Sequence, residues 1–370
     1  MKNYIICNVS DQTIPVVLFI NEMSSQIKID NIFFLYTSYS CKKLDFIKEA
    51  CPIFNSLYLE IELKEPDSLK SIKDTLSESF NEDKFRDAHF LVDITCGTKM
   101  MSIALFEYFK EFSAEIFYIY SQKESFRRIY PGNQRVETLF QYRIPLNSYL
   151  LAHGIALVNS GLLQYDIEFL NNVFDCCRKA KKVISKLHKD SKEILSKGKQ
   201  NKSRPLFPVK NIDGLDDLCR SLNFTSEFLN FDQIKFITGG WFEQYIFAHL
   251  PDCLSLTSDL NCHLRRRDTQ VENEFDVMFI YKNRLFIIEA KTSLQGTSSL
   301  ANDTLYKSKA LEKDFGLRTK TIIATLDSEI AGKKSFLFRA EIMEVALLLE
   351  NDLIPESLSN NLQFLICNSS

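Results

Sequence analysis

Hydrophobic and polar positions alternate along roughly the first 145 residues in a pattern typical of a sheet flanked by helices. Runs rich in β-branched and aromatic residues predict strands at residues 4–9, 31–36, 57–61, 88–94 and 114–120. Amphipathic segments between them predict helices near residues 11–24, 40–50, 66–80 and 99–112. Because strands that alternate with helices usually form a parallel sheet, the pattern predicts a Rossmann-like domain.

A different pattern, over residues 273–291, predicts a β-hairpin whose turn is centred on Lys282 and Asn283. Tyr281 then pairs with Arg284, and residues two apart along each strand share a face of the sheet. One face of this hairpin is apolar and is formed by Phe275, Val277, Phe279, Phe286, Ile288 and Ala290. It must therefore pack on another part of the protein.

The other face of the hairpin contains facing acids. The same register places Asp276 opposite Glu289 and Glu274 opposite Lys291. Directly opposed residues have Cβ atoms about 4.5–5.5 Å apart, and like charges there are destabilising. A divalent cation that prefers oxygen ligands, Mg²⁺ or Mn²⁺, would reverse this effect, and Lys291 would either orient the attacking water or stabilise charge on the transition state of a phosphate. The hairpin therefore predicts a metal-dependent nuclease site.

The hairpin also has a simpler interpretation. A surface hairpin with a solvated polar face and a Glu274–Lys291 ion pair has the same sequence pattern. Lys-Asn is also a weaker turn signal than Asn-Gly, and a one-residue bulge would separate the two carboxylates. Beyond the hairpin, a helix over 300–315 that ends at Gly316, a strand over 320–326 and a helix over 336–350 would complete an αβ sandwich.

Two loops that follow predicted strands contain polar residues suited to phosphate binding, residues 8–13 and residues 93–99. In parallel sheets ligands bind beyond the carboxyl ends of the strands, where helix N-termini direct N–H groups at anions. Neither loop matches Gly-x-Gly-x-x-Gly or Gly-x-x-x-x-Gly-Lys-[Ser/Thr], so neither a dinucleotide-binding fold nor a P-loop is supported. An ordinary capped turn between strand and helix is the alternative interpretation.

Composition and charge restrict the class of protein. The 370 residues allow two or three domains, and the formal net charge of −3 excludes an overall polycation. The ten cysteines show no Cys-x-x-Cys and no zinc-site spacing with histidine, which favours reduced thiols of a cytosolic protein. The longest apolar run, residues 149–163, is interrupted by polar residues and is too short to span a bilayer. We expect a cytoplasmic protein with no membrane partner.

Two basic segments are candidates for contacting a nucleic-acid backbone. Residues 178–204 contain eleven Lys or Arg against two acids and are predicted to form a charged helix that continues into a loop. Arg265, Arg266 and Arg267 precede the hairpin and lie close in sequence to the predicted metal site. Neither segment has the regular aromatic residues of a stacking platform, which favours low base specificity. A solvated helix face is the alternative for the first segment.

Residues 93–99, Asp-Ile-Thr-Cys-Gly-Thr-Lys, resemble the (N/D)-x-T-G-G-T-K signature of the CARF domain, a Rossmann-like sensor of cyclic oligoadenylates in type III CRISPR immunity. Residues 10–15 are similar to the first-strand motif of the same sensors. Cys96 stands where the signature usually has its first glycine. The resemblance implies that a cyclic oligoadenylate contacts Ser10, Gln12, Thr13, Thr95, Cys96, Gly97, Thr98 and Lys99.

Residues 273–276 and 289–291 are similar to the PD-(D/E)XK core of restriction-endonuclease-like proteins, and residues 239–243 resemble the helix that precedes that core. The resemblance implies that Asp276 and Glu289 are ligands of Mn²⁺ or Mg²⁺. It also implies a set of catalytic residues composed of Asp276, Glu289, Lys291 as the catalytic lysine and Glu243 as an accessory acid. Glu274 either joins this set or only anchors Lys291.

The order of the two motifs resembles the CARF-fused PD-(D/E)XK ancillary nucleases of type III CRISPR systems. The resemblance implies a homodimer that cyclic tetra-adenylate activates allosterically to nick or cleave DNA and/or RNA with low sequence specificity in antiviral defence. The expected α/β fold has a Rossmann-like CARF sensor with a mostly parallel sheet at residues 1–147, a basic helical linker at 148–235, and a restriction-endonuclease-like αβ sandwich at 236–370.

Two rival functions belong to other classes. The first is a non-enzymatic cyclic-nucleotide sensor that binds nucleic acid or a partner protein, although such a module has no need of opposed acids. The second is a site-specific restriction enzyme with an unrelated N-terminal domain, which would cut duplexes in a sequence-dependent manner without an activator.

Overall fold

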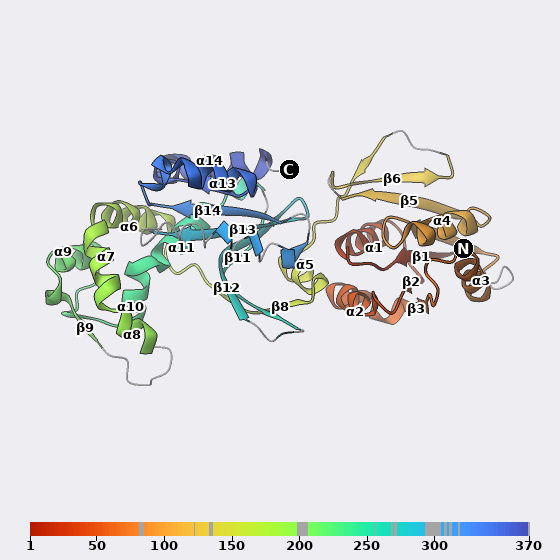
Figure 1. Ribbon diagram of the computed structural model, residues 1–370, viewed down its shortest axis with the longest axis horizontal. Helices are drawn as coiled ribbons and strands as arrows, with labels where there is room; N and C mark the ends of the chain where they lie inside the picture. The colour runs from red at the N-terminus through yellow and green to blue at the C-terminus, as the bar shows by residue number, and fades with distance from the viewer. Residues whose placement is uncertain are drawn as a thin grey trace.

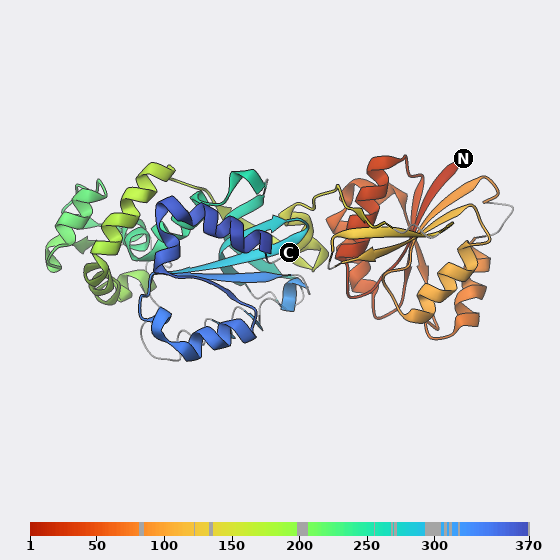
Figure 2. The same cartoon turned by 90° about the horizontal axis from the view of Figure 1, so that it is seen from above.

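The structure is a computed structural model that describes residues 1–80, 85–121, 123–132, 136–197, 206–254, 256–267, 269, 272–292, 305–306, 309–310, 313–316 and 319–368. The molecule is elongated, with one sheet near its N-terminus and a second sheet in the C-terminal half (Figure 1). The helices formed by the middle of the chain lie at the end farthest from the N-terminal sheet (Figure 2).

The N-terminal sheet confirms the predicted, mostly parallel arrangement. Across the sheet the strands are β3 (Tyr58–Glu62), β2 (Asn31–Tyr36), β1 (Lys2–Asn8), β4 (Ala88–Asp93), β5 (Ala114–Tyr120), β6 (Ser125–Tyr130) and β7 (Thr138–Leu139). The first five are the predicted strands and are parallel, whereas β6 and β7 extend the sheet in antiparallel fashion. These last two strands were not predicted.

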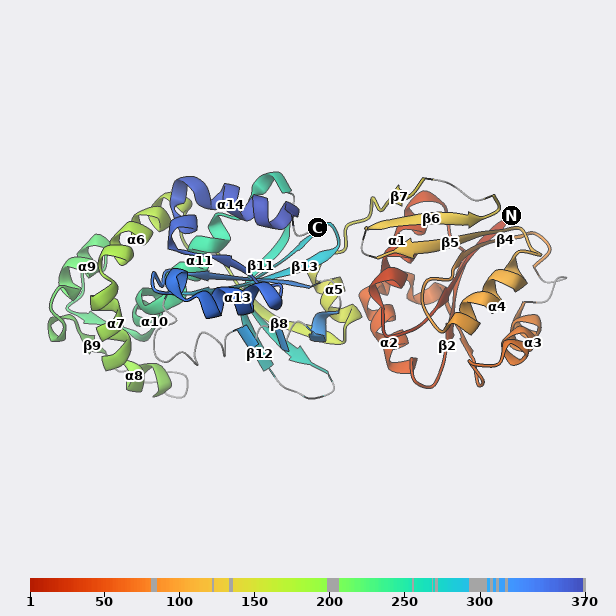
Figure 3. The same ribbon diagram turned by 45° about the horizontal axis from the view of Figure 1, so that its top comes forward.

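Four helices cover the two faces of this sheet, as predicted (Figure 3). They are α1 (Ile14–Gln26), α2 (Cys41–Ala50), α3 (Leu69–Ser79) and α4 (Lys99–Phe109), with a short 3₁₀ helix, η1 (Pro52–Leu57), after α2. Buried residues of α1 and α2 form one hydrophobic cluster with the sheet, and those of α3 and α4 form another. The carboxyl ends of β1, β4 and β5 therefore lie between helices that cover opposite faces of the sheet.

The C-terminal sheet is built around the predicted hairpin. Across the sheet the strands are β15 (Ala346–Leu348), β14 (Lys320–Thr325), β13 (Arg284–Lys291), β12 (Glu272–Tyr281), β11 (Thr257–Arg266) and β8 (Ile155–Gly161). Strands β13, β14 and β15 are parallel, and the other neighbours are antiparallel. Strand β8, which comes from the predicted linker region, thus forms one edge of the sheet.

The predicted hairpin register is confirmed over the five pairs nearest the turn, the last of which joins Val277 to Ile288. Lys282 and Asn283 have φ values of 47° and 56°. Positive φ at both central residues is what a two-residue type I′ turn requires, so no bulge shifts the strands at this point.

One residue of the predicted apolar face lies elsewhere. Phe275 was expected beside Val277, but it packs in the other cluster, with Met278 and Ile280, and its ring contacts that of Phe315. The recorded pairing of β12 with β13 ends at Val277, so the ladder does not fix the face that Phe275 takes.

The segment after β14 differs from the prediction. The predicted helix 336–350 is α13 (Lys334–Ile342) followed by strand β15, because Glu344 has a φ of 54° and ends the helical course. The remaining elements are η6 (Ile330–Gly332), η7 (Glu350–Leu353) and α14 (Pro355–Asn368), the last of which was not predicted. Most of the predicted helix 300–315 lies outside the described residues, apart from short pieces that include η5 (Lys313–Phe315).

The middle of the chain is largely helical. Its elements are α6 (Ile167–Lys179), α7 (Lys181–Asp190), α8 (Lys192–Lys197), β9 (Phe207–Pro208), η2 (Val209–Asn211), α9 (Leu215–Ser221), β10 (Phe228–Leu229), α10 (Phe231–Lys235), the π-helical η3 (Phe236–Gly240), α11 (Trp241–Ala248) and η4 (Asp252–Leu254). The predicted basic helix corresponds to α7 and α8, and the loop expected after it lies outside the described residues. None of the described helices has the length and apolar composition that crossing a membrane needs.

Helix α5 (Leu146–Ala152) lies between the two sheets (Figure 1). A single hydrophobic cluster contains residues of α1 and α2, of α5, and of the hairpin face formed by Met278, Ile280, Leu285 and Ile287. The two sheets are thus joined by a continuous buried interface, through which a change in one half can reach the other.

Candidate nuclease site and sensor cavity

Strands β12 and β13 bring Asp276, Glu289 and Lys291 together. Both carboxylates are buried, each with 8% of the residue surface exposed. The Nζ atom of Lys291 lies 2.8 Å from Oδ2 of Asp276 and 3.1 Å from Oε2 of Glu289. Burial by itself would lower the pKa of Lys291, but the two carboxylates raise it well above its usual value. The ammonium group of Lys291 therefore forms an ion pair with both carboxylates.

The carboxylate of Asp276 is also fixed by the backbone. The N–H of Ala290 donates a 2.7 Å hydrogen bond to Oδ2 of Asp276, just beyond the last recorded pair of the hairpin ladder. Beyond Val277 and Ile288 the two strands no longer pair, and the Asp276 carboxylate accepts the backbone N–H that a carbonyl of β12 would otherwise accept. This arrangement holds the acid in place and points it toward Lys291.

Glu243 lies on α11, near these residues. One face of this helix is buried, because Phe242, Tyr245 and Ile246 have no exposed surface. Burial, followed by the negative charge of Asp276, raises the pKa of Glu243 to about 7. Its Oε2 atom is buried and has no hydrogen-bond partner among the described residues. The carboxylate is thus available for a cation or a proton.

Glu274 does not pair with Lys291. Its Oε1 atom lies 3.9 Å from Nζ of Lys235 and 3.7 Å from Nε2 of His263. Lys235 at the end of α10 and His263 on β11 were not among the predicted site residues. Neither has a local sequence signal, because their proximity to the hairpin arises only from the packing of α10 and β11.

The three predicted nucleic-acid arginines all form ion pairs with carboxylates. Arg265 pairs with Glu272 on β12. Arg266 Nη1 lies 2.6 Å from Asp314, and Arg267 pairs with Glu49 of α2. In this arrangement the arginines stabilise contacts within the protein, and their role in binding nucleic acid stays a prediction.

In the sensor half, the 93–99 motif builds its own loop. The Thr95 hydroxyl donates to Asp93 at 2.5 Å and accepts the N–H of Ile119 at 2.8 Å. Gly97 has a φ of 86°, and a Cβ there would lie 3.1 Å from Cβ of Asn8. Thr98 caps α4 by accepting the N–H of Met101 at 3.2 Å.

The two predicted ligand loops contact each other directly. The Cys96 thiol is buried and lies 3.3 Å from the carbonyl oxygen of Gln12. Ser10 accepts the N–H of Gln12 at 3.2 Å, and Lys99 is exposed at the start of α4. Burial raises the pKa of Asp93, under the second loop, to about 6, and the hydrogen bonds from Thr95 oppose this rise.

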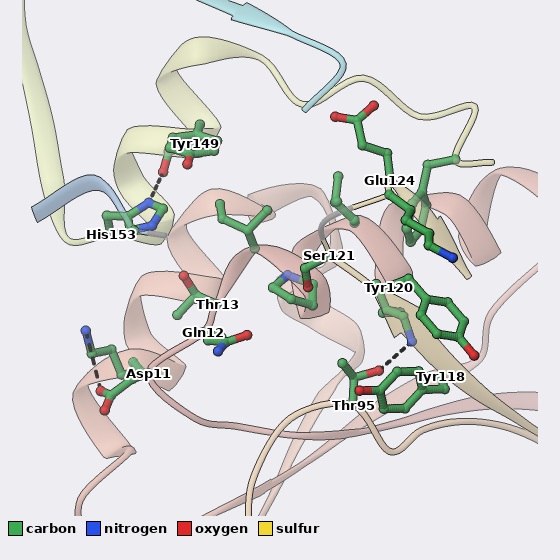
Figure 4. Close-up of a pocket in the computed structure, with 18 of the residues that line it drawn as sticks. Asp11, Gln12, Thr13, Thr95, Tyr118, Tyr120, Ser121, Glu124, Tyr149 and His153 are labelled. Atoms are coloured by element: carbon green, nitrogen blue, oxygen red, sulfur yellow. Dashed lines mark hydrogen bonds and ion pairs between the residues drawn. The ribbon is translucent and has the colours of Figure 1, made fainter. Parts of the chain in front are cut away.

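A cavity of about 990 Å³ opens beyond the carboxyl ends of β1, β4 and β5 (Figure 4). This volume is at the upper end of the ~300–1,000 Å³ range of ligand pockets. Of the predicted ligand residues, Gln12, Thr13 and Thr95 line it, and Ser10, Cys96, Gly97, Thr98 and Lys99 do not. The position beyond the strand ends is the one expected for a Rossmann-like sensor.

Several residues that were not among the predicted ligand contacts complete the cavity. They are Asp11, Lys43, Tyr118, Tyr120, Ser121, Lys123, Glu124, Tyr149 and His153, together with Lys309, Asp314 and Gly316 from the C-terminal half. The rings of Tyr118 and Tyr120 are 5.0 Å apart, and the ammonium of Lys123 lies 5.5 Å from the Tyr120 ring. Aromatic rings beside cations suit a ligand that combines bases with phosphates.

Fold and site together define a two-part protein, with a Rossmann-like sensor and a nuclease-like sandwich. A family model for the Card1 CARF domain matches residues 5–149, and one for the Card1-like endonuclease domain matches residues 231–357. The two models together match most of the chain. The chain therefore belongs to the CARF-fused nucleases of the Card1 type.

Solved structures share this fold. Protein VC1899 from Vibrio cholerae is 18% identical, with 98% of each chain covered and a TM-score of 0.77. Can2 from Sulfobacillus thermosulfidooxidans, solved with cyclic tetra-adenylate, is 20% identical, with 98% of each chain covered and a TM-score of 0.73. A type III CRISPR defence DNA nuclease activated by cyclic oligoadenylate is 14% identical over 88% of this chain and 45% of its own, with a TM-score of 0.56. None of the curated proteins matches the chain.

Proposed function

We propose that this protein is a metal-dependent endonuclease of CRISPR antiviral defence that cyclic tetra-adenylate activates. The observation that supports it most is the bridging of Asp276 and Glu289 by Lys291 at the end of a confirmed hairpin, in a chain whose other half is a CARF domain. Lys291 offsets only one of the two buried negative charges, so the site keeps a net negative charge that a further cation would neutralise, and a pure binding module has no need of such a site.

The residues present fit a Mn²⁺ or Mg²⁺ ion. Asp276 and Glu289 would hold it, because both are buried carboxylates whose oxygens already converge on one cationic group. Among the described residues no group of three His, Cys, Asp or Glu side chains forms a metal cluster, and the protein donors that we propose are these two acids. When bound, such an ion lowers the pKa of a coordinated water and offsets charge on the phosphate.

The chain's own residues supply the rest of the chemistry. Lys291 donates from a fixed position to developing negative charge, which is the task of a preorganised cation. Ala290 orients Asp276 through its backbone N–H. Glu243, whose Oε2 atom is buried and has no partner among the described residues, would hold or release a proton near Asp276.

The activator is cyclic tetra-adenylate, bound in the cavity beyond β1, β4 and β5. Tyr118 and Tyr120 would stack on adenine rings, and Lys43 and Lys123 would lie near phosphates. A cyclic ligand with repeated units suits a twofold site, so we propose that two copies of the chain share one activator as a homodimer. The substrate is DNA and/or RNA, cut with low sequence specificity.

Cleavage assays test this proposal. Labelled single-stranded and duplex DNA and RNA are incubated with the protein and Mn²⁺, with and without cyclic tetra-adenylate. We expect little cleavage without the activator, strong cleavage with it, and none when EDTA removes the metal. Equal cleavage with and without the activator would refute the switch, and activator binding with no cleavage of any strand would favour a non-enzymatic sensor.

A further inference from the structure

Helix α5 and the residue that follows it form part of the wall of the sensor cavity, next to Gly316 of the C-terminal half. Tyr149 and His153 both line the cavity (Figure 4). Their rings are 4.8 Å apart, and Nδ1 of His153 lies 2.9 Å from the carbonyl oxygen of Tyr149. Thr13, from the first sensor loop, donates a 2.6 Å hydrogen bond to the carbonyl oxygen of Ala152 on the same helix. Tyr149 is only 1% exposed, so a ligand in the cavity would act on it through His153, which is partly exposed at the end of α5.

The same two side chains contact the nuclease half. The Tyr149 hydroxyl donates a 2.9 Å hydrogen bond to the carbonyl oxygen of Phe315, and both groups are buried. Gly316 packs so closely on His153 that a Cβ at this glycine would lie 2.6 Å from Nε2 of the histidine. A shift of either ring thus displaces residues 315–316, because close-packed interiors transmit such shifts.

From Phe315 the contact continues to the catalytic hairpin. The ring of Phe315 packs edge-on against that of Phe275, with centroids 5.4 Å apart, and Phe275 immediately precedes Asp276. Asp314 lies 2.6 Å from Arg266 of β11, the strand that pairs with β12. The base of the hairpin is thereby attached to the cavity wall.

The turn of the same hairpin is attached to the sensor as well. The Asn283 side chain accepts the N–H of Ile144 at 2.8 Å and donates to the carbonyl oxygen of Tyr142 at 3.0 Å. The N–H of Tyr142 in turn donates to Glu22 of α1 at 2.8 Å. Asn283 and Glu22 are both buried. The hairpin is therefore held by the sensor at both of its ends.

We propose that Tyr149, through Phe315 and Phe275, is a positioning residue that couples occupation of the cavity to the placement of Asp276. This inference rests on the proposed function and deepens it by assigning a route for the activation. The buried hydroxyl-to-carbonyl bond is the link that a single conservative substitution removes, since Tyr149→Phe retains the ring that lines the cavity.

The test compares full-length wild type with Tyr149→Phe under single-turnover conditions with Mn²⁺. The activation ratio, cleavage rate with saturating cyclic tetra-adenylate over the rate without it, is expected to fall about two- to tenfold, the range for loss of one hydrogen bond. The half-saturating activator concentration, measured separately by calorimetry, is expected to change less than twofold. The matched control is Tyr58→Phe, which removes a 2.6 Å hydroxyl bond to the carbonyl oxygen of Cys51 within the sensor alone.

A second variant tests the other attachment. Asn283→Gly keeps a residue that adopts the positive φ of the turn but lacks the amide that bonds Tyr142 and Ile144, and it is expected to lower the activation ratio in the same way. An unchanged ratio in Tyr149→Phe would overturn the inference whatever Asn283→Gly does, as would loss of activator binding in Tyr149→Phe, because Tyr149 would then be a ligand contact only. A wild type that binds cyclic tetra-adenylate without activation would instead refute the proposed function itself.

Discussion

The nuclease site and the sensor cavity use their polar residues in opposite ways. At the nuclease site the predicted side chains converge: Lys291 lies within 3.1 Å of both Asp276 and Glu289. In the sensor, most of the motif residues stabilise the conformation of the loops. The Thr95 hydroxyl, for example, forms two hydrogen bonds within the protein. The walls that a ligand would touch come largely from other segments, such as Tyr118 and Lys123.

This difference shows what a sequence motif reports. A motif within one hairpin places functional groups directly, because strand register fixes which side chains meet. A motif in a loop of a Rossmann-like sheet instead reports the shape of the backbone, through a glycine with positive φ and a helix cap. Substitutions in the two motifs should therefore fail in different ways, one by loss of chemistry and the other by loss of fold.

The largest expected effect is at Glu289. Glu289→Ala should lower activator-dependent cleavage roughly a thousandfold, because several kcal/mol of transition-state stabilisation depend on the metal that the carboxylate holds. Binding of cyclic tetra-adenylate, measured by calorimetry, should be unchanged, since the sensor is intact. Glu350→Ala is the matched control. It removes an acid outside the hairpin whose Oε1 atom lies 2.7 Å from Nζ of Lys181. Cleavage that persists in Glu289→Ala would remove this residue from the site.

Lys291 should have the next largest effect. Lys291→Met is expected to lower the cleavage rate by about 10²–10³-fold, which is typical for loss of one preorganised donor to developing charge. Lys291→Arg should restore part of the rate because it retains the positive charge beside Asp276 and Glu289. Single-turnover rates at saturating Mn²⁺ measure both variants, and equal rates in Lys291→Met and wild type would contradict the assignment.

In the sensor motif the expected loss is in stability. Gly97→Ala adds a Cβ at a φ of 86° and 3.1 Å from Asn8, so it should combine about 1–2 kcal/mol of backbone strain with a further ~1–3 kcal/mol of crowding. Gly132→Ala is the matched control, because Gly132 also has a positive φ, 66°, but nothing lies within 4 Å of an added Cβ. Urea unfolding measures both, and equal losses would show that the close approach at Gly97 has no energetic effect.

The smallest expected effect is a pH dependence at Asp93. Its pKa is raised to about 6 in the folded protein by burial, whereas an unfolded aspartate titrates near 4. The folded state therefore binds the proton more tightly, and stability falls as pH rises between about 4 and 6. Asp93→Asn, which cannot ionise, should gain stability relative to wild type above pH 6 and lose this advantage below pH 4.

Thermal denaturation from pH 4 to pH 8 measures this difference in melting temperature. Asp74→Asn, at an exposed position of α3, provides the control for removal of a charge. A difference between Asp93→Asn and wild type that does not vary with pH would contradict a raised pKa for Asp93.

Much of the fold could be predicted from the sequence because its signals are local. The alternation of the first 145 or so residues predicted the parallel strands and the four helices around them, and the turn at Lys282 and Asn283 fixed the hairpin register. Strands β6 and β7, and the strand β15 inside a predicted helix, could not be predicted in this way. Their conformation depends on neighbouring strands, and a left-handed residue such as Glu344 has no reliable local signal.

The site residues also fall into those that local sequence predicts and those that only tertiary packing brings together. Asp276, Glu289 and Lys291 lie within one hairpin, so counting positions from the turn brought them together. Lys235 and His263 reach Glu274 from elements distant in sequence, and only tertiary packing places them there. Tyr149 and His153 belong to a mostly apolar run, whose pattern indicates a buried helix and gives no sign that it also lines a cavity.

A crystal of cleavage-active protein soaked in Mn²⁺ tests the central claim most directly, namely that the two hairpin carboxylates hold a catalytic cation. Anomalous scattering should show a peak within about 2.2 Å of a carboxylate oxygen of both Asp276 and Glu289, with the ammonium of Lys291 displaced from between them. Absence of a peak at this position, with Lys291 still bonded to both acids, would contradict the claim.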